Sequence, residues 1–195
     1  MKTRYVSIDI ETTGLDPGTS QVLEFAAVIE DWTSPVESLP SLRLLVDHGA
    51  ITGHPFALTM NARLIAELCR PNPSDRAPFG PDWPGGSERV TPDQVGPAFT
   101  AFLSRHLPGV TPTLAGKNAA TFDIPFLSRL PNWPRCRHRV VDVGTLWWWP
   151  ETDEALPDTA ACLTRSGVTN DNLHSALADC RAVIGMVRAR FPGPA

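Results

Sequence analysis

Two acidic residues, Asp9 and Glu11, stand two positions apart in a segment whose residues alternate between apolar and polar. This alternation, from residue 5 to 11, is typical of a β-strand, so both carboxylates should project from the same face. Side chains at i and i+2 lie about 6–7 Å apart along a strand, close enough to share one or two hard cations. The alternative is a solvent-facing strand edge with two ordinary acids, and the pair alone does not decide between them.

A third acid, Asp123, follows a predicted short strand at 113–115 and lies near the start of a predicted helix at 119–130. It should face the carboxyl edge of the sheet, where sites usually form in α/β proteins. An acid in a first helical turn also complements the helix dipole, which is the simpler interpretation of Asp123 taken alone. This helix accommodates Pro125 only if that residue lies in its first turn.

His174 and Asp179 lie five positions apart, which would separate them by about 140° on one helix. If Ser175 is the N-cap, Asp179 falls in the first turn and His174 lies on the preceding loop, free to reach the same cavity. An imidazole with a pKa near 6.5 is mostly neutral at pH 7 and can accept a proton, as a general base must. A histidine at this place is also typical of a surface or capping residue.

The remaining pattern predicts the elements that must position these residues. Further strands are expected at 22–29, 42–46 and 139–143. Helices are expected at 56–68, from a Thr91 N-cap to about 106, at 157–167, and along a final apolar stripe between 173 and 191. Strands first and interleaved helices later predict an α/β protein with a mixed sheet and helices packed on it.

The whole chain, 1–195, is expected to form one domain, because 42% hydrophobic and 19% charged residues suit a single sizeable core. Prolines and glycines crowd the segment at about 70–90, which predicts an exposed loop insertion. A passive insertion is favoured over an adaptor or a lid above the site.

The net charge of −4 and the isoelectric point near 5.7 argue against a protein that coats long duplexes through a basic surface. They do not exclude an enzyme that holds a few terminal nucleotides through metal ions. The four cysteines show no Cys-x-x-Cys pair and follow no secretory leader, which predicts a reducing cytoplasm rather than a disulfide framework. No apolar stretch approaches the roughly 18 residues of a membrane span, so no membrane partner is expected.

Three segments, at 9–15, 118–123 and 174–179, resemble in order and context the three motifs of the DEDDh (DnaQ-like) 3′–5′ exonucleases. The first reads Asp-Ile-Glu-Thr-Thr-Gly-Leu, the second ends in Phe-Asp, and the third reads His-Ser-Ala-Leu-Ala-Asp. Polymerase proofreading subunits, oligoribonuclease and ribonuclease T belong to this family. The first motif is specific, whereas the other two gain weight from their combination with it.

The resemblance implies a ribonuclease-H-like fold, a mixed five-stranded sheet flanked by helices. It implies that Asp9, Glu11, Asp123 and Asp179 hold two Mg²⁺ or Mn²⁺ ions and that His174 is the general base. The expected reaction releases nucleoside 5′-monophosphates from the 3′ end of single-stranded DNA or RNA. The only tyrosine is Tyr5, far from the third motif, which favours the histidine subclass over the tyrosine subclass.

By the same resemblance, a further group of residues is expected to bind substrate. Its members are Thr12, Thr13, Gly14, Leu15, Asn118 and Phe122. Leu15 offers an apolar face on which any base can pack, and Phe122 is either a stacking wedge or part of the core. Glu24 resembles a frequent family acid beside the site, with a bond to the hairpin backbone as the alternative. Asp142 resembles a supporting acid of the family.

Two departures affect what surrounds the site: Lys117 precedes Asn118 where many members carry His-Asn, and Val143 follows Asp142 where a threonine is usual. The three tryptophans at 147–149 cannot share one helical face, so core packing plus a partly exposed patch is expected.

Two other functions stay open: a non-catalytic nucleic-acid or protein-binding module on the same fold, and an endonuclease on that fold. Homodimerisation, common in some relatives, is also left open.

Overall fold

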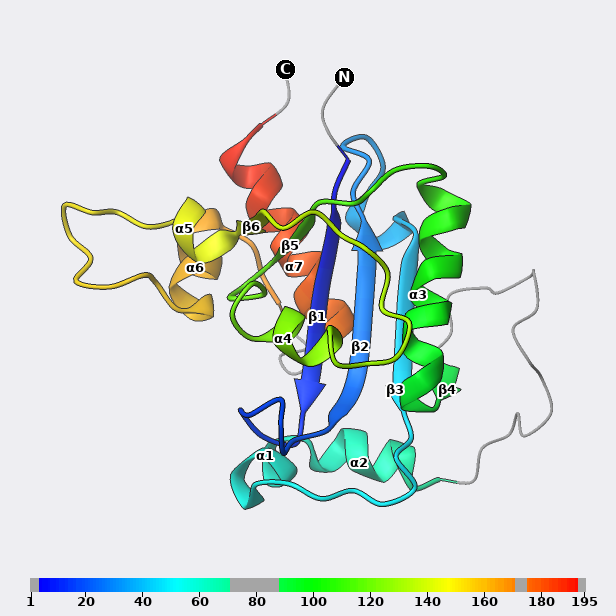
Figure 1. Cartoon of the computed structure of the whole chain (residues 1–195). Helices are drawn as coiled ribbons and strands as arrows, with labels where there is room; N and C mark the ends of the chain where they lie inside the picture. The colour runs from blue at the N-terminus through cyan, green and yellow to red at the C-terminus, as the bar shows by residue number, and fades with distance from the viewer. Residues whose placement is uncertain (1–3, 71–87, 171–174, 193–195) are drawn as a thin grey trace.

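A six-stranded mixed sheet forms the centre of the protein, in the order β4-β3-β2-β1-β5-β6 (Figure 1). The computed structural model describes residues 4–70, 88–170 and 175–192. The strands are β1 Val6–Thr12, β2 Val22–Ile29, β3 Ser41–Val46, β4 Glu88–Val90, β5 Leu114–Gly116 and β6 Val140–Asp142. The helices are η1 Val36–Ser38, α1 Pro55–Met60, α2 Ala62–Leu68, α3 Pro92–His106, α4 Asp123–Leu127, α5 Val143–Leu146, α6 Thr159–Ser166 and α7 Ala176–Arg190.

The expected α/β class and mixed sheet are confirmed, but the strand count of five was wrong. β1 is antiparallel to β2 and β2 to β3, whereas the β1–β5, β5–β6 and β3–β4 pairs are parallel. The sixth strand, β4, lies in the stretch assigned to the loop insertion at 70–90. Its Val90 is buried and pairs with Val46, so a short apolar contact with β3 outweighs the loop-forming composition of the preceding segment. The rest of that insertion, 71–87, lies outside the described residues.

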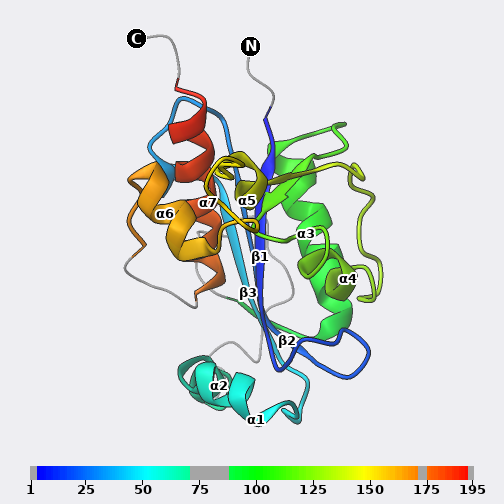
Figure 2. The ribbon, with the colours of Figure 1, turned by 90° about the vertical axis from the view of Figure 1, so that its left-hand side faces the viewer.

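Helices cover both faces of the sheet, as the edge-on view in Figure 2 shows. α3 and α4 lie on one face, where Phe25 of β2 and Phe99 of α3 meet edge to face, with ring centroids 5.2 Å apart. Trp133 stacks on Phe99 at 4.9 Å and closes this core. The other face packs against α5, α6 and α7. There Cys180 of α7 lies close enough for its Sγ to reach the carbonyl oxygen of Ala26 at 3.5 Å, because small side chains let the helix approach the strand.

The predicted helix at 56–68 is two helices, α1 and α2, which meet at Asn61. The Asn61 side chain turns inward and its Nδ2 donates to the Thr12 carbonyl at 3.1 Å, while its backbone leaves the helical region at ψ 15°. A long-range bond therefore breaks the helix where the apolar spacing alone predicts continuity.

The predicted helix at 119–130 is much shorter, because residues before Asp123 form a turn. Asn118 adopts a left-handed φ of 58°, and its carbonyl accepts the N–H groups of Thr121 and Phe122, both at 2.9 Å. α4 then spans Asp123–Leu127, which places Pro125 in its first turn, the only place where the helix tolerates it.

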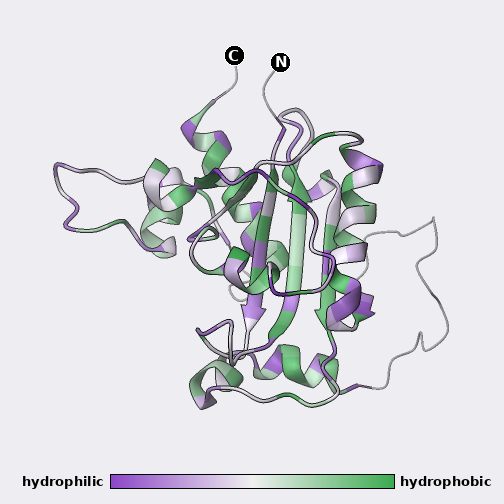
Figure 3. Ribbon diagram, viewed as in Figure 1, coloured by the Kyte–Doolittle hydropathy of each residue, from purple (hydrophilic) through white to green (hydrophobic). Residues whose placement is uncertain are grey.

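The helix predicted after Thr91 is confirmed as α3, with Thr91 as N-cap and its N–H bonded to Gln94 Oε1 at 2.9 Å. The last helix is α7, with Ser175 at its N-cap as expected. Among the described helices, none combines the length and the apolar character that crossing a bilayer demands. In Figure 3 hydrophobic residues follow the strands, whereas the carboxyl end of β1 is hydrophilic.

Replacing Phe99 by alanine tests the aromatic core. Phe99 is fully buried between Phe25 and Trp133, so Phe99→Ala should lower the free energy of unfolding by about 3–5 kcal/mol. Urea unfolding followed by tryptophan fluorescence measures the loss. Phe191→Ala, at a half-exposed position, is the control and should change stability by less than about 0.5 kcal/mol. Equal effects in the two variants would contradict this view of the core.

Candidate active site

Three of the four predicted acids converge at the carboxyl end of β1. Asp9 and Glu11 share the face of β1 opposite to the one that Val6, Ile8 and Ile10 bury. Asp179 reaches them from the first turn of α7. One carboxylate oxygen from each of these acids lies within 4.8 Å of the others, a spacing that one hard cation can bridge.

Asp123, the fourth acid, approaches from the open edge of β1. The register pairs between β1 and β5 end at Ser7, so α4 can come up beside the strand beyond that point. Asp123 is 3% exposed and accepts a hydrogen bond from the Ile10 amide, while within the described part of the chain its Oδ1 has no partner. Its charge is among those that raise the pKa of Asp9.

The acids repel one another in a partly desolvated site. Burial, followed by the charges of Asp123 and Asp179, raises the pKa of Asp9 well above its ordinary value. Burial and then the charges of Glu24 and Asp179 raise the pKa of Glu11 to about 7. A donor set made only of carboxylate oxygens, short of counter-charge, is what Mg²⁺ or Mn²⁺ prefers.

A β-bulge turns the chain away immediately after these acids. Glu11 pairs with Glu24, but Thr12 pairs with Val22, so the register shifts between Glu11 and Thr12. The loop that follows is held against the segment before α1, where a Cβ on Gly53 would lie 2.4 Å from the Thr13 carbonyl oxygen. Only glycine permits this close approach.

Glu24 fixes the helix that carries Asp179. It is 1% exposed, forms an ion pair with Arg43, and its Oε2 accepts the N–H of Ala176 at 3.2 Å. Ala176 is the first residue of α7, and the Ser175 side chain makes no capping bond. A carboxylate on β2 therefore caps α7 in place of Ser175, which ties the position of Asp179 to the sheet.

Two further contacts hold the site. Asn170 Nδ2 donates to Asp179 Oδ1 at 2.6 Å. Asp142 accepts the N–H of Asn118 at 2.6 Å and that of Thr145 at 3.1 Å. The supporting role expected for Asp142 thus corresponds to hydrogen bonds with backbone N–H groups, one of which holds the turn that leads to Asp123.

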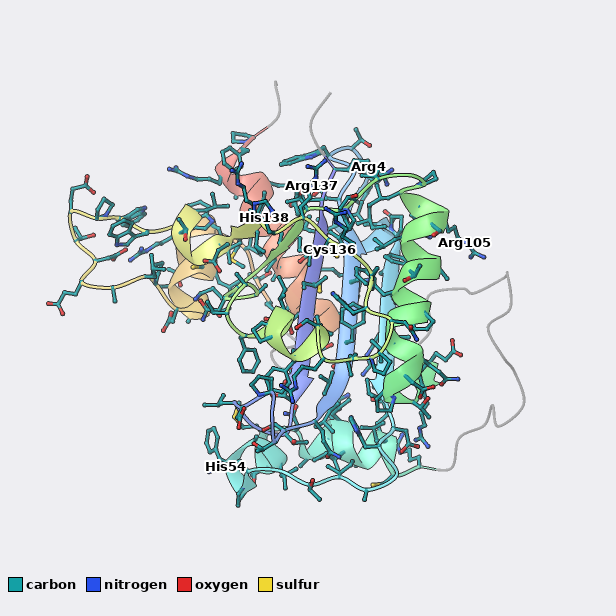
Figure 4. The ribbon with its side chains drawn as sticks, in the orientation of Figure 1. Arg4, His54, Arg105, Cys136, Arg137 and His138 are labelled. Atoms are coloured by element: carbon teal, nitrogen blue, oxygen red, sulfur yellow. The ribbon has the colours of Figure 1, made fainter. Side chains whose placement is uncertain are left out.

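A pocket of about 760 Å³ opens beside Glu11. It is lined by Glu11, Thr12, Gly14, Leu15, Phe56, Met60 and Phe122, with His54, labelled beside α1 in Figure 4, at its wall. Of the residues expected to bind substrate, Thr13 is absent from this lining, because its fully buried hydroxyl accepts the N–H of Gln21 at 2.8 Å. The wall from α1 was not predicted. Phe56 and Met60, two apolar residues off the buried stripe of the predicted helix, were the available signal.

A second hollow, of about 320 Å³, lies on the other side of the acids. Asp9, Glu11 and Asp179 line it together with Lys117 and Asn118. Glu11 and Phe122 belong to both hollows, so the acids stand between a large apolar pocket and a smaller charged one. Asn118 therefore lies near the acids, but apart from the pocket that Leu15 lines.

Comparison with known proteins agrees with this geometry, although no family model matches the chain. An oligoribonuclease from Halorhodospira halophila is 28% identical over 188 residues, which cover 93% of this chain and 88% of that protein. Among solved structures, E. coli exonuclease I in complex with a 5cy-dT13 oligonucleotide superposes with a TM-score of 0.61 at 16% identity. A zinc-bound complex of E. coli exonuclease I with single-stranded DNA gives a TM-score of 0.64 at 14% identity.

The likeness to exonuclease I shows the fold: it covers 98% of this chain, which spans only 41% and 42% of the two exonuclease I chains. The oligoribonuclease likeness extends over nearly the whole of both chains. The chain is thus similar to an oligoribonuclease in sequence and to exonuclease I in fold. The resemblance inferred from the three motifs is thereby confirmed.

Several features of this site lie beyond what the three motifs predict. His174, the expected general base, lies outside the described residues, so its role stays a prediction. Arg43 and Asn170 were not identified from the sequence. The only sequence signal for Arg43 was its charge, which is unusual between Leu42 and Leu44 in a predicted apolar strand. No local signal marks Asn170.

The metal-free protein should lose stability as pH rises from about 5 to 8. The pKa of Glu11 is near 4.5 in the unfolded chain and about 7 in the folded one, and that of Asp9 is also raised, so the folded state binds more protons in this window. Stability is then greatest below the unfolded pKa and declines as pH rises through the folded one. Thermal unfolding in EDTA measures the trend.

Asp9→Asn should flatten this trend and raise the melting temperature at pH 8 by at least about 2 °C, because it removes one repelling charge. Glu37→Gln, at an exposed acid of η1, is the matched control and should keep the wild-type trend. Identical pH profiles for wild type and Asp9→Asn would contradict the mutual repulsion of the acids.

Proposed function

We propose that this protein is a 3′–5′ exonuclease that releases nucleoside 5′-monophosphates from single-stranded DNA or RNA. The observation that carries the proposal is the cluster of Asp9, Glu11 and Asp179, with the charge of Asp123 acting on Asp9, beside an apolar pocket that Glu11 lines. The homology to an oligoribonuclease and the fold of exonuclease I support the same reaction class.

The acids suit two Mg²⁺ or Mn²⁺ ions. Oxygens of Asp9, Glu11 and Asp179 are close together, and burial raises the pKa values of Asp9, Glu11 and Asp123. In the described part of the chain Asp123 Oδ1 has no hydrogen-bond partner. Asp9, Glu11, Asp123 and Asp179 would hold the ions. Bound ions would neutralise the phosphate and supply Lewis acidity at the phosphorus.

The chain's own residues would then place the strand end. Leu15 is 85% exposed and Phe56 is 67% exposed, so both offer apolar surface to a base in the pocket beside Glu11. Filling this pocket with the terminal nucleoside brings its phosphate to the acids at the mouth. His174 would take the proton of the attacking water.

The direct test is degradation of a 5′-labelled single-stranded oligonucleotide. In Mg²⁺ or Mn²⁺ the protein should shorten it stepwise from the 3′ end, and EDTA should abolish the reaction, because the acids alone repel the phosphate. Internal cuts without a terminal ladder would support the endonuclease alternative. Binding without cleavage would support a non-catalytic module.

Variants at the predicted site separate catalysis from folding. Asp9→Asn and Asp179→Asn should remove turnover while the protein stays folded, with the former also more stable at pH 8. His174→Ala should keep metal affinity and lose about 10²–10⁴-fold in rate, the usual scale for a general base. Calorimetric titration with Mn²⁺ gives the metal affinity. Wild-type turnover in Asp179→Asn would refute the metal-ligand assignment.

A further inference from the structure

Positive charge is concentrated in one segment of this acidic protein. The net charge is −4, yet residues 124–141 contain four arginines and no Asp or Glu. These arginines are Arg129, Arg135, Arg137 and Arg139. The preceding stretch, 94–122, also lacks acids. Such a separation creates a local positive surface that the overall charge conceals.

The structure brings this segment to the end of the sheet remote from α1. The chain from α4 to β6 passes over α3 and climbs along the sheet (Figure 1). Arg137 Nε donates to the Thr111 carbonyl at 3.2 Å, and Arg4 Nη1 donates to the His106 carbonyl at 3.1 Å. His106 is the last residue of α3, and Thr111 lies in the connection between α3 and β5, so two guanidinium groups lie at the end of α3 and on the connection that follows it. Figure 4 shows Arg4, Arg137 and His138 gathered there.

These basic side chains keep most of their donors available. Arg4, Arg135, Arg137 and Arg139 are exposed, and within the described residues none of them forms an ion pair. A guanidinium group has five N–H donors, of which Arg137 donates one to a carbonyl and Arg4 donates two. The surface can therefore bind several anionic oxygens without first breaking a salt bridge.

The segment that carries these arginines begins beside the candidate site. The pKa of Asp16 is lowered chiefly by the Gly18 amide and the Thr19 hydroxyl, with a smaller contribution from the positive charge of Arg129. Asp16 lines the pocket proposed for the terminal nucleoside. Phe122, directly before α4, lines the same pocket, and Arg129 follows the end of α4. The arginine segment therefore begins near that pocket and continues along the chain toward the opposite end.

We propose that Arg129, Arg135, Arg137, Arg139 and Arg4 form a track that binds the phosphates of a single-stranded substrate upstream of its 3′ end. The inference rests on the proposed exonuclease function and adds a preference for longer strands. β1 has seven residues, so the track spans about 23 Å at roughly 3.3 Å per residue. Only strands long enough to extend from the pocket along the length of β1 would reach the far end of the track.

The test compares a 3-mer and a 15-mer with a pair of charge-neutralised variants. Arg135→Gln/Arg139→Gln should raise KM for the 15-mer by roughly tenfold while kcat, and KM for the 3-mer, stay unchanged. The slope of log KM for the 15-mer against the logarithm of the salt concentration should decrease by about 1.4, because each lost phosphate contact on a single strand contributes about 0.7. Arg63→Gln/Arg70→Gln, which removes two exposed arginines of α2 and its C-terminal end, is the matched control and should behave as wild type.

Fluorescence anisotropy of the 15-mer, with Asp9→Asn added to each protein, measures binding without turnover. A roughly tenfold weaker affinity in the Arg135/Arg139 variant supports the track. Equal affinities in that variant and the control would overturn the proposal that the track binds the strand. The basic segment would then serve a partner of other chemistry. If the wild-type protein cleaves neither oligonucleotide, the proposed exonuclease function is wrong. The anisotropy measurement then tests by itself whether the arginine track binds a single strand.

Discussion

Mutual repulsion of carboxylates at the end of β1 is the constraint that the rest of the structure must withstand. Burial raises the pKa values of Asp9 and Glu11, and the charges of Asp123 and Asp179 raise them further. Bringing like charges together lowers the stability of the folded chain. Such a cluster therefore persists only where other contacts hold the acids in place. β1 supplies such contacts, because it is paired with β2 along its whole length and packed from both faces.

A fifth acid shows how the fold separates structural charge from functional charge. Glu24 is the register partner of Glu11 on the neighbouring strand β2. It forms an ion pair with Arg43, which also contacts Glu67 of α2 at 3.3 Å. Arg43 pairs with Glu24, although the Glu24 charge still raises the pKa of Glu11, and Glu24 provides the acceptor that caps α7. Arg43 thus supplies counter-charge behind Glu11, whereas among the described residues Lys117 is the cation that lines the hollow beside the acids, where an external cation or phosphate-bound ion would enter.

Charge is also divided along the molecule. The acids occupy the carboxyl end of β1, whereas the exposed arginines of 135–139 lie toward the opposite end. A polyanion needs cations at the reacting phosphate and positive surface along the rest of its length. An overall net charge of −4 describes neither end of this protein.

The sequence by itself determined the features encoded by local periodicity. The alternation around Asp9 and Glu11 predicted their shared face, and the order of three short motifs predicted the family. Thr91 marked the start of α3 through a local capping box, whereas Ser175 marked the N-cap position of α7 although its side chain makes no capping bond.

Only the tertiary structure decided the features that depend on distant partners. The break at Asn61 comes from a bond to Thr12, 49 positions away, and Glu24 reaches Ala176 across 152 positions. β4 forms because β3 offers it an edge, and α1 becomes a pocket wall because Gly53 lets it approach the loop at Thr13. Such contacts leave no periodic trace in the chain, since their energy comes from surfaces that meet only after folding.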